Sequence, residues 1–159
     1  MKKKWLSIVL VVSLLLGFTI ALIYYGDAES LHEIKVSIHY FEVEEIHLTN
    51  CSILIIINIS NPSGRDIYDL SSSFEIFIEN ISIGKGGFSG VNIPSNAVTR
   101  IEVPINMMYS GLADAAVEAI KNIWRGESNE VSIIGELNSS TLFGLARVSY
   151  HFKVTKIIQ

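Results

Sequence analysis

The sequence contains a single cysteine, Cys51, and therefore excludes a disulfide bond within the chain, even if the chain faces an oxidising compartment. Cys51 stands at the start of an isoleucine-rich segment. We interpret it as a small buried apolar residue, and a reactive thiol is the alternative. The cysteine content thus gives no sign of a disulfide-stabilised scaffold.

Motifs for catalysis and metal binding are also missing. The serines form no G-x-S-x-G elbow, and residues 84–87 (GKGG) lack the spacing and the following Ser or Thr of a phosphate-binding loop. We therefore predict a protein that is not an enzyme and has no cofactor or bound metal. Acidic residues at 42, 44 and 45 leave a calcium-binding turn as an alternative to a solvated turn. Histidine spacing matches no ligand pattern such as H-x-x-x-H: the four are His32, His39, His47 and His151.

Charge is absent from one long stretch near the N-terminus. Residues 5–25 contain 21 consecutive uncharged residues. As a helix at about 1.5 Å per residue they would span roughly 31 Å, close to the hydrocarbon thickness of a bilayer. The sequence therefore predicts a transmembrane anchor over residues 1–26, which would attach the protein to a membrane. A cleaved signal peptide is the alternative, but its apolar region is usually shorter, and no A-x-A pattern follows this one.

The residues on either side of this stretch predict its orientation. Lys2, Lys3 and Lys4 precede it, and Asp27 and Glu29 follow it. By the positive-inside rule, the N-terminus would be cytoplasmic and the C-terminal domain extracytoplasmic, in a single-pass cell-membrane protein. Beyond residue 26 the chain carries sixteen acidic residues and nine Lys or Arg, a net charge of about −7. This balance argues against nucleic acid as a partner.

Alternating patterns after a predicted linker at 27–33 indicate one mostly β domain over residues 34–159. Isoleucine supplies 25 of the 159 residues, and β-branched side chains favour strands. Residues 34–40 alternate with Ile34, Val36, Ile38 and Tyr40 on one face, and residues 46–60 predict a central strand covered on both sides. The segment 61–64 (NPSG) ends that strand in a turn.

The remaining patterns complete the count of strands. Residues 74–83 predict a tight hairpin at Glu79-Asn80, and residues 84–87 predict a loose connection. Residues 98–106 predict an edge strand, because Pro104 cannot donate a hydrogen bond to a neighbouring strand. Two more strands follow at 131–137 and 148–154. Between them and the edge strand, residues 110–125 predict an amphipathic helix, capped by Ser110 and closed by Gly126. The fold class is therefore mainly β: an antiparallel β-sandwich of about seven strands with one added α-helix, after a single transmembrane helix.

Four N-x-S/T sequons stand in the domain, slightly more than chance predicts. They have meaning only in a glycosylating compartment. We expect the hairpin and turn positions, Asn80 and Asn138, to be more accessible than the strand positions, Asn50 and Asn58.

Several segments, in this order, resemble the late embryogenesis abundant type 2 family, whose module is also called the water stress and hypersensitive response (WHy) domain. They are Asn61-Pro62 after the isoleucine-rich strand, 67–70 (IYDL), 74–86 (FEIFIENISIGKG), 93–96 (IPSN), 101–105 (IEVPI), 111–114 (GLAD), 134–136 (IGE) and 141–144 (TLFG). Together they extend over roughly residues 34–154. Ser63 departs from the Asn common at that position, and Leu142 from a common Pro.

The resemblance implies an immunoglobulin- or fibronectin-III-like sandwich and a link to desiccation or other stress. It implies no catalytic residues. Its structural motif residues are Asn61, Pro62, Val103 and Pro104, and we interpret Asn61-Pro62 as a side-chain-capped turn, with a binding role as the alternative. The expected function is a non-enzymatic, membrane-anchored protein that protects proteins or membrane through weak contacts with many clients. An extracytoplasmic module for one specific protein partner is the alternative, and a hydrolase is the third.

Overall fold

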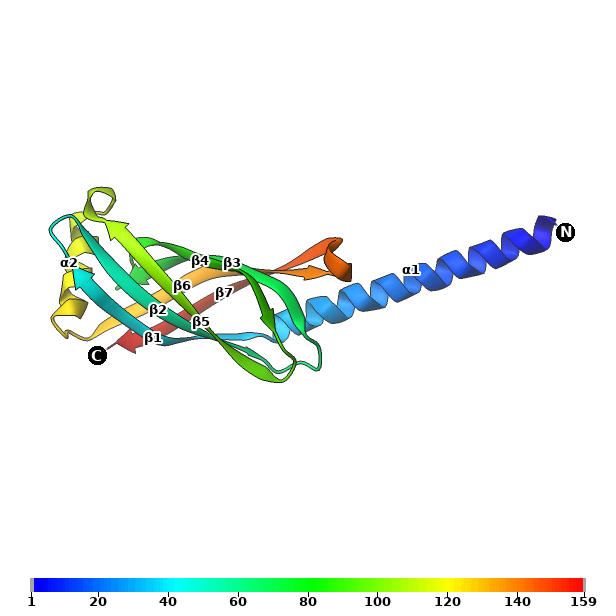
Figure 1. Ribbon diagram of the computed structural model, residues 1–159, viewed down its shortest axis with the longest axis horizontal. Coiled ribbons are helices and arrows are strands. Elements are labelled where there is room, and N and C mark those ends of the chain that lie inside the picture. Colours follow the sequence, from blue (N-terminus) through cyan, green and yellow to red (C-terminus); the bar gives the residue numbers. More distant parts are fainter. Residues whose placement is uncertain (1, 159) are drawn as a thin grey trace.

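The computed structural model describes residues 2–158, so Gln159 of the predicted domain lies outside the described residues. Seven antiparallel strands form two sheets, one of three strands in the order β1-β2-β5 and one of four in the order β4-β3-β6-β7 (Figure 1). The predicted mainly β, two-sheet architecture is confirmed. The elements are α1 (Lys2–Glu33), β1 (Lys35–Ile46), β2 (Asn50–Asn61), β3 (Ile67–Ile78), β4 (Ile81–Ile93), β5 (Ala97–Met108), η1 (Tyr109–Gly111), α2 (Asp114–Trp124), β6 (Asn129–Thr141), η2 (Leu142–Gly144) and β7 (Ala146–Ile158).

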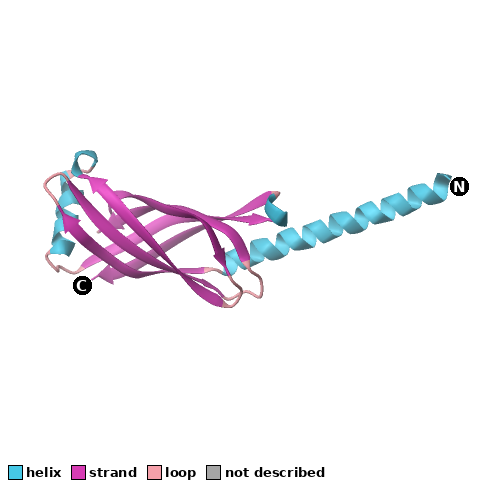
Figure 2. Ribbon diagram, viewed as in Figure 1, coloured by secondary structure: helices cyan, strands magenta, loops and turns pink. Residues whose placement is uncertain are grey.

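The two helices lie at opposite ends of the sandwich (Figures 1 and 2). Helix α1 is long and apolar enough to cross a membrane, and most of its length projects away from the sheets. Helix α2 contacts β1, β3 and β4, and it buries Ala116, Ala119 and Ile120. The end of the sandwich beside α1 carries three loops. The β2–β3 and β4–β5 loops cross from one sheet to the other, and the β6–β7 loop joins two paired strands of the four-stranded sheet.

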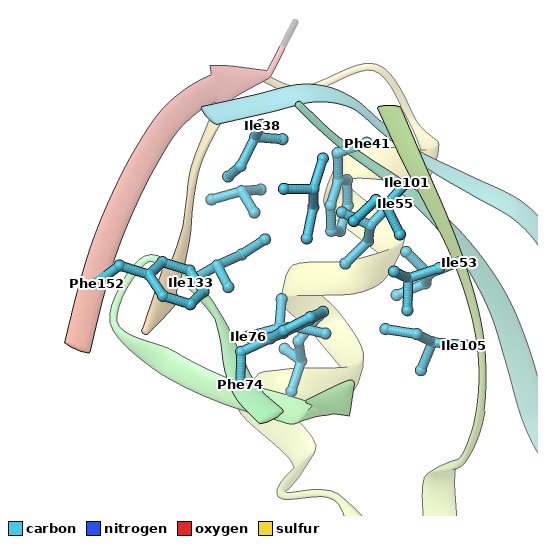
Figure 3. Close-up of a cluster of buried hydrophobic side chains, with 14 of the residues drawn as sticks. Ile38, Phe41, Ile53, Ile55, Phe74, Ile76, Ile101, Ile105, Ile133 and Phe152 are labelled. Carbon is cyan, nitrogen blue, oxygen red and sulfur yellow. The ribbon is translucent and has the colours of Figure 1, made fainter. Parts of the chain in front are cut away.

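The core lies between the sheets and is rich in isoleucine (Figure 3). Alternation of side chains along each strand sends every second residue inward, so period-2 isoleucines gather on one face. From β2, Ile53, Ile55 and Ile57 are at most 1% exposed. Opposite them, Phe74 and Ile76 of β3 point into the same space.

The prediction that β2 is covered on both sides is wrong. β2 is the central strand of its sheet, but Leu54 and Ile56 are only half-buried on the outer face. Within the sheet, Leu54 is paired with Glu42 and Pro104, and Ile56 with Tyr40 and Glu102, so side chains of β1 and β5 flank both residues.

A β-bulge corrects the predicted inward face of β1. The register shifts between Ile38 and Tyr40, so the alternation reverses at His39. Tyr40 therefore points outward and is 42% exposed, while Phe41 and Val43 enter the core. The acidic residues 42, 44 and 45 belong to this strand and not to a turn.

Residues 84–87, predicted as a loose connection, are part of β4 and pair with β3. The glycines are required by close packing around Phe74. A Cβ atom on Gly86 would lie 2.6 Å from a ring carbon of Phe74, and one on Gly135 of β6 would lie 2.5 Å from its Cβ. The glycines that predicted a flexible segment are instead needed because the ring of Phe74 packs closely against the strand.

The other strand predictions are confirmed. β5 is an edge strand with Pro104 on its exposed face. Glu79 and Asn80 connect β3 to β4 with φ values of 49° and 66°, the left-handed pair that a tight type I′ hairpin requires.

The predicted boundaries of both helices need correction. The expected linker at 27–33 is helical, because Ala28 and Leu31 pack against the core and continue α1 into the domain. Helix α2 ends before Gly126, as predicted, and Gly126 has a φ of +81°. Its start is at Asp114, because Ser110 belongs to the 3₁₀ turn η1 and caps nothing.

We predict that Gly135→Ala lowers the free energy of unfolding by about 2 kcal/mol, because the added methyl meets the backbone and Cβ of Phe74 in a tightly packed strand pair. Urea unfolding of the full chain in detergent, followed by far-UV circular dichroism, measures this loss. Gly64→Ala is the control, since nothing lies within 4 Å of a Cβ there; its effect should be less than about 1 kcal/mol. Equal stability of the two variants would contradict the packing argument.

Candidate functional site at the helix–sandwich junction

Asn61, the last residue of β2, is fully buried at the end of the sandwich next to α1. Its side-chain nitrogen donates to the carbonyl of Arg65 at 2.8 Å, in the β2–β3 loop, and to those of Pro94 and Ile93 at 3.1 and 3.4 Å, at the end of β4. Its oxygen accepts from the backbone nitrogen and the hydroxyl of Ser63 at 3.1 and 2.7 Å. One amide therefore holds two loops together, because it satisfies backbone groups of both.

The four motif residues do not form a single site. Pro62 is exposed beside Asn61, while Val103 is buried in the middle of β5 opposite Ile55, and Pro104 is exposed on the outer face. Asn61 pairs with Ala97, at the other end of β5 from Met108. The hydrogen bonds of Asn61 describe a structural cap, and the remaining motif residues serve strand packing and an edge.

Asp27 of α1 connects the helix to two parts of the domain. One carboxylate oxygen accepts from Nη1 of Arg65 at 3.1 Å, and the other accepts from the hydroxyl of Thr141 at the end of β6. Ser30 and Leu31, one turn further along α1, are at most 5% exposed. The last two turns of α1 are therefore built into the sandwich.

Asp66 joins the β2–β3 loop to the β4–β5 loop on the outside of the same end. The backbone nitrogen of Ser95 donates to its Oδ1 at 2.7 Å, and the hydroxyl of Tyr68 donates to its Oδ2 at 3.2 Å. The Ser95 bond and then the Tyr68 bond favour the ionised carboxylate, so the pKa of Asp66 lies below its ordinary value. The same contact with Asp66 raises the pKa of Tyr68.

A cavity of about 490 Å³ lies between α1, the start of β3 and the turn from β6 into η2. Its wall is mixed, with aliphatic side chains on the α1 and β3 sides and hydroxyls from β6. Asp27 and Asp66 give it two carboxylates, of which Asp27 is paired with Arg65. The lining residues are Ile23, Asp27, Ser30, Asp66, Ile67, Tyr68, Ser139, Ser140, Thr141, Leu142 and Gly144.

Reactive side chains do not converge at this junction. Across the residues that the structure describes, no three His, Cys, Asp or Glu side chains gather as metal ligands would. The acidic residues proposed as a calcium turn make other contacts: Glu42 accepts from the hydroxyl of Tyr40 at 2.6 Å, and Glu45 lies 3.1 Å from His47. Cys51 is completely buried near the other end, and burial raises the pKa of its thiol, as expected of an unreactive packing residue.

The sequons are placed differently from expectation at one position. Asn80 is exposed in the hairpin turn, as predicted. Asn138 lies within β6 and not in a turn, and its side-chain oxygen accepts from the hydroxyl of Ser149 at 2.6 Å. Its accessibility is therefore that of a half-buried strand residue, like Asn50 and Asn58.

Sequence reasoning missed the residues that build the junction. Asp27, Arg65 and Thr141 are far apart in the chain. Asp27 falls in the predicted linker, whereas Arg65 and Thr141 lie outside the predicted strands. Only the position of Arg65, four residues after Asn61 in the capped turn, carried a local signal. The contacts depend on the docking of α1, which no pattern along the chain describes.

No family model and no curated protein sequence matches the chain. Among solved structures, a protein from Arabidopsis thaliana determined in solution is similar, with a TM-score of 0.59 and 14% identity, covering 78% of this chain and 80% of its own. At that identity the likeness shows a shared fold alone.

Two further structures are similar at lower TM-scores, which carry no argument about function. A crystal structure from Archaeoglobus fulgidus has a TM-score of 0.43 and 12% identity, covering 80% of this chain and 94% of its own. A protein provisionally identified as a late embryogenesis abundant (LEA) protein has a TM-score of 0.42 and 9% identity, covering 94% of this chain and 88% of its own.

We predict that Asn61→Ala lowers the free energy of unfolding by about 3 kcal/mol, because it removes the buried amide donor that the carbonyls of two loops share. Thermal and urea unfolding of the full chain measure the loss. Pro62→Ala is the matched control from the same motif, since Pro62 is exposed, and it should change stability by less than about 1 kcal/mol. A loss of stability for Asn61→Ala as small as that for Pro62→Ala would show that the amide caps no essential turn.

Proposed function

We propose that this chain is a non-enzymatic, membrane-anchored protein that protects proteins or membrane during desiccation or related stress. The observation that carries the proposal is the ordered resemblance of residues 34–154 to the late embryogenesis abundant type 2 family. The sandwich fold agrees with it, since that resemblance implies such a fold. The buried, structural position of Asn61 also agrees, because it explains why the motif is needed without assigning it a ligand.

The anchor is α1, from the uncharged run 5–25 to the point where Asp27 meets the domain. Exposed apolar side chains along it, such as Leu15 at 61% and Phe18 at 64%, would lie in lipid. The lysines before the run and the acidic groups after it support a cytoplasmic N-terminus and an extracytoplasmic sandwich.

A protease added outside intact cells should therefore digest the sandwich while the anchor remains in the membrane. The positive-inside rule is the physical reason, because Lys2, Lys3 and Lys4 resist translocation. Immunoblots against the C-terminus and against an N-terminal tag measure the two parts. Survival of the C-terminal signal in intact cells, with its loss only after permeabilisation, would contradict this orientation.

The outer face of the three-stranded sheet is the surface that would meet clients. On it, the half-buried Leu54 lies between Glu42 of β1 and Pro104 of β5, and the half-buried Ile56 lies between Tyr40 and Glu102. A narrow apolar strip beside exposed carboxylates favours weak contacts with clients. The net charge of about −7 beyond residue 26 makes neighbouring molecules repel one another and so opposes aggregation. Such a surface fits many loosely held clients.

The test is recovery of a fragile reporter enzyme that is dried and rehydrated with vesicles carrying the full chain. We expect more activity to return than with equal mass of an unrelated acidic β-sandwich fused to residues 1–26, because the same anchor then leaves only the domain to differ. Recovery equal to that of the fusion would remove the protective function.

The alternative is a module that binds one specific partner, and two surfaces favour it. The unpaired edge of β5 around Pro104 and the exposed turn at Glu79-Asn80 are free to meet a second chain. Substitutions there, such as Asn80→Lys, should leave reporter protection unchanged if contacts are weak and numerous. Loss of a single stoichiometric crosslinked protein on one such substitution would instead favour the module.

A further inference from the structure

We propose that the tip of the β6–β7 hairpin, residues 142–145, inserts into the interface of the lipid bilayer beside α1 and forms a second membrane contact. This inference rests on the proposed anchoring of α1. It adds a surface of the domain that nothing in the sequence identified, and it names lipid as the occupant of that surface.

The tip lies at the level where α1 leaves its uncharged run. Figure 1 shows η2 reaching further along α1 towards the N-terminus than the β2–β3 and β4–β5 loops. Contacts join η2 to α1, and Leu142 and Gly144 line the same cavity as Ile23 and Asp27. Ile23 belongs to the uncharged run 5–25, and Asp27 is the first charge after it.

The depth follows from helix geometry. Ile23 and Asp27 are four residues apart, or about 6 Å along a helix. The headgroup region on each side of the hydrocarbon core is about 5–8 Å thick. If the uncharged run spans the core, the tip therefore lies in the headgroup region, at the same depth as the exposed Tyr24 and Tyr25.

The tip is chemically suited to that depth. No charge occurs from Thr141 to Ala146, and Leu145 is 87% exposed. Leu142 has a φ of +51°, an unfavourable conformation for a leucine, and Gly144 a φ of +87°. Leu142 is half-buried against the cavity, whereas Leu145 faces outward. A strained turn that exposes a leucine gains nothing in water, whereas lipid would cover that leucine.

The opposite end of the sandwich provides the comparison. Leu48, in the β1–β2 loop, is 99% exposed, but its neighbours His47 and Thr49 are polar, and the loop lies at the α2 end away from α1. Two leucines of similar exposure thus differ in their distance from the anchor, which makes them a matched pair for a depth measurement.

The experiment uses the full chain in phosphatidylcholine vesicles with single cysteine substitutions, Leu145→Cys, Leu48→Cys and Leu15→Cys, each carrying an environment-sensitive dye. Leu15 reports the anchor itself. Unsubstituted chain is the control for dye uptake, because the thiol of Cys51 is fully buried. Circular dichroism of each variant verifies the fold, and lipids with a quencher on the acyl chain measure contact with the bilayer.

We expect the dyes at 15 and 145 to be quenched several-fold more than the dye at 48, and the dye at 145 to emit further to the blue than the dye at 48. Quenching of the dye at 15 without quenching at 145 would overturn the proposed contact of the tip with lipid, while the anchoring of α1 would still hold. A blue shift at 145 without lipid quenching would also overturn it, because a protein would then cover the tip. Absence of quenching at both positions would overturn the anchor and the tip together.

Discussion

The side chain of Asn61 is the interaction on which the architecture of one end of the domain depends. Three loops meet at that end, and their backbone groups must be satisfied although little regular structure is there to pair them. Asn61 supplies donors to the loop on one side and to the end of β4 on the other, and it accepts from Ser63. An amide is suited to this because it both donates and accepts.

The same end receives the helix that carries the domain. Leu31 is completely buried in the core, and Asp27 bonds to Arg65 and Thr141. Arg65 is held in place by the turn that Asn61 caps, since its carbonyl accepts from the Asn61 amide. The cap, the ion pair and the docked helix are therefore coupled, and a change in one alters how the sandwich is held on α1.

Strand type was predictable from alternation, but the side of the sheet that each residue faces was less so. Phe74 and Ile76 entered the core as their spacing indicates. Tyr40 did not, because a bulge at His39 reverses the alternation, and a bulge has no signature in a run of alternating residues. The prediction of a loose connection at the glycines of β4 was wrong for a related reason. A run of glycines can indicate a loop or a strand against which another side chain packs closely.

Elements with a local signal can be derived from the amino-acid sequence. They are an apolar helix long enough for a bilayer, about seven strands in a mainly β domain, the tight turn at Glu79-Asn80 and the edge strand marked by Pro104. Each depends on residues within a few positions of one another. That α1 continues into the core and that the β6–β7 tip lies beside it became visible in the folded arrangement. Contacts such as Asp27 with Thr141 join residues far apart in the chain, and they exist only after the sheets have closed around the end of the helix.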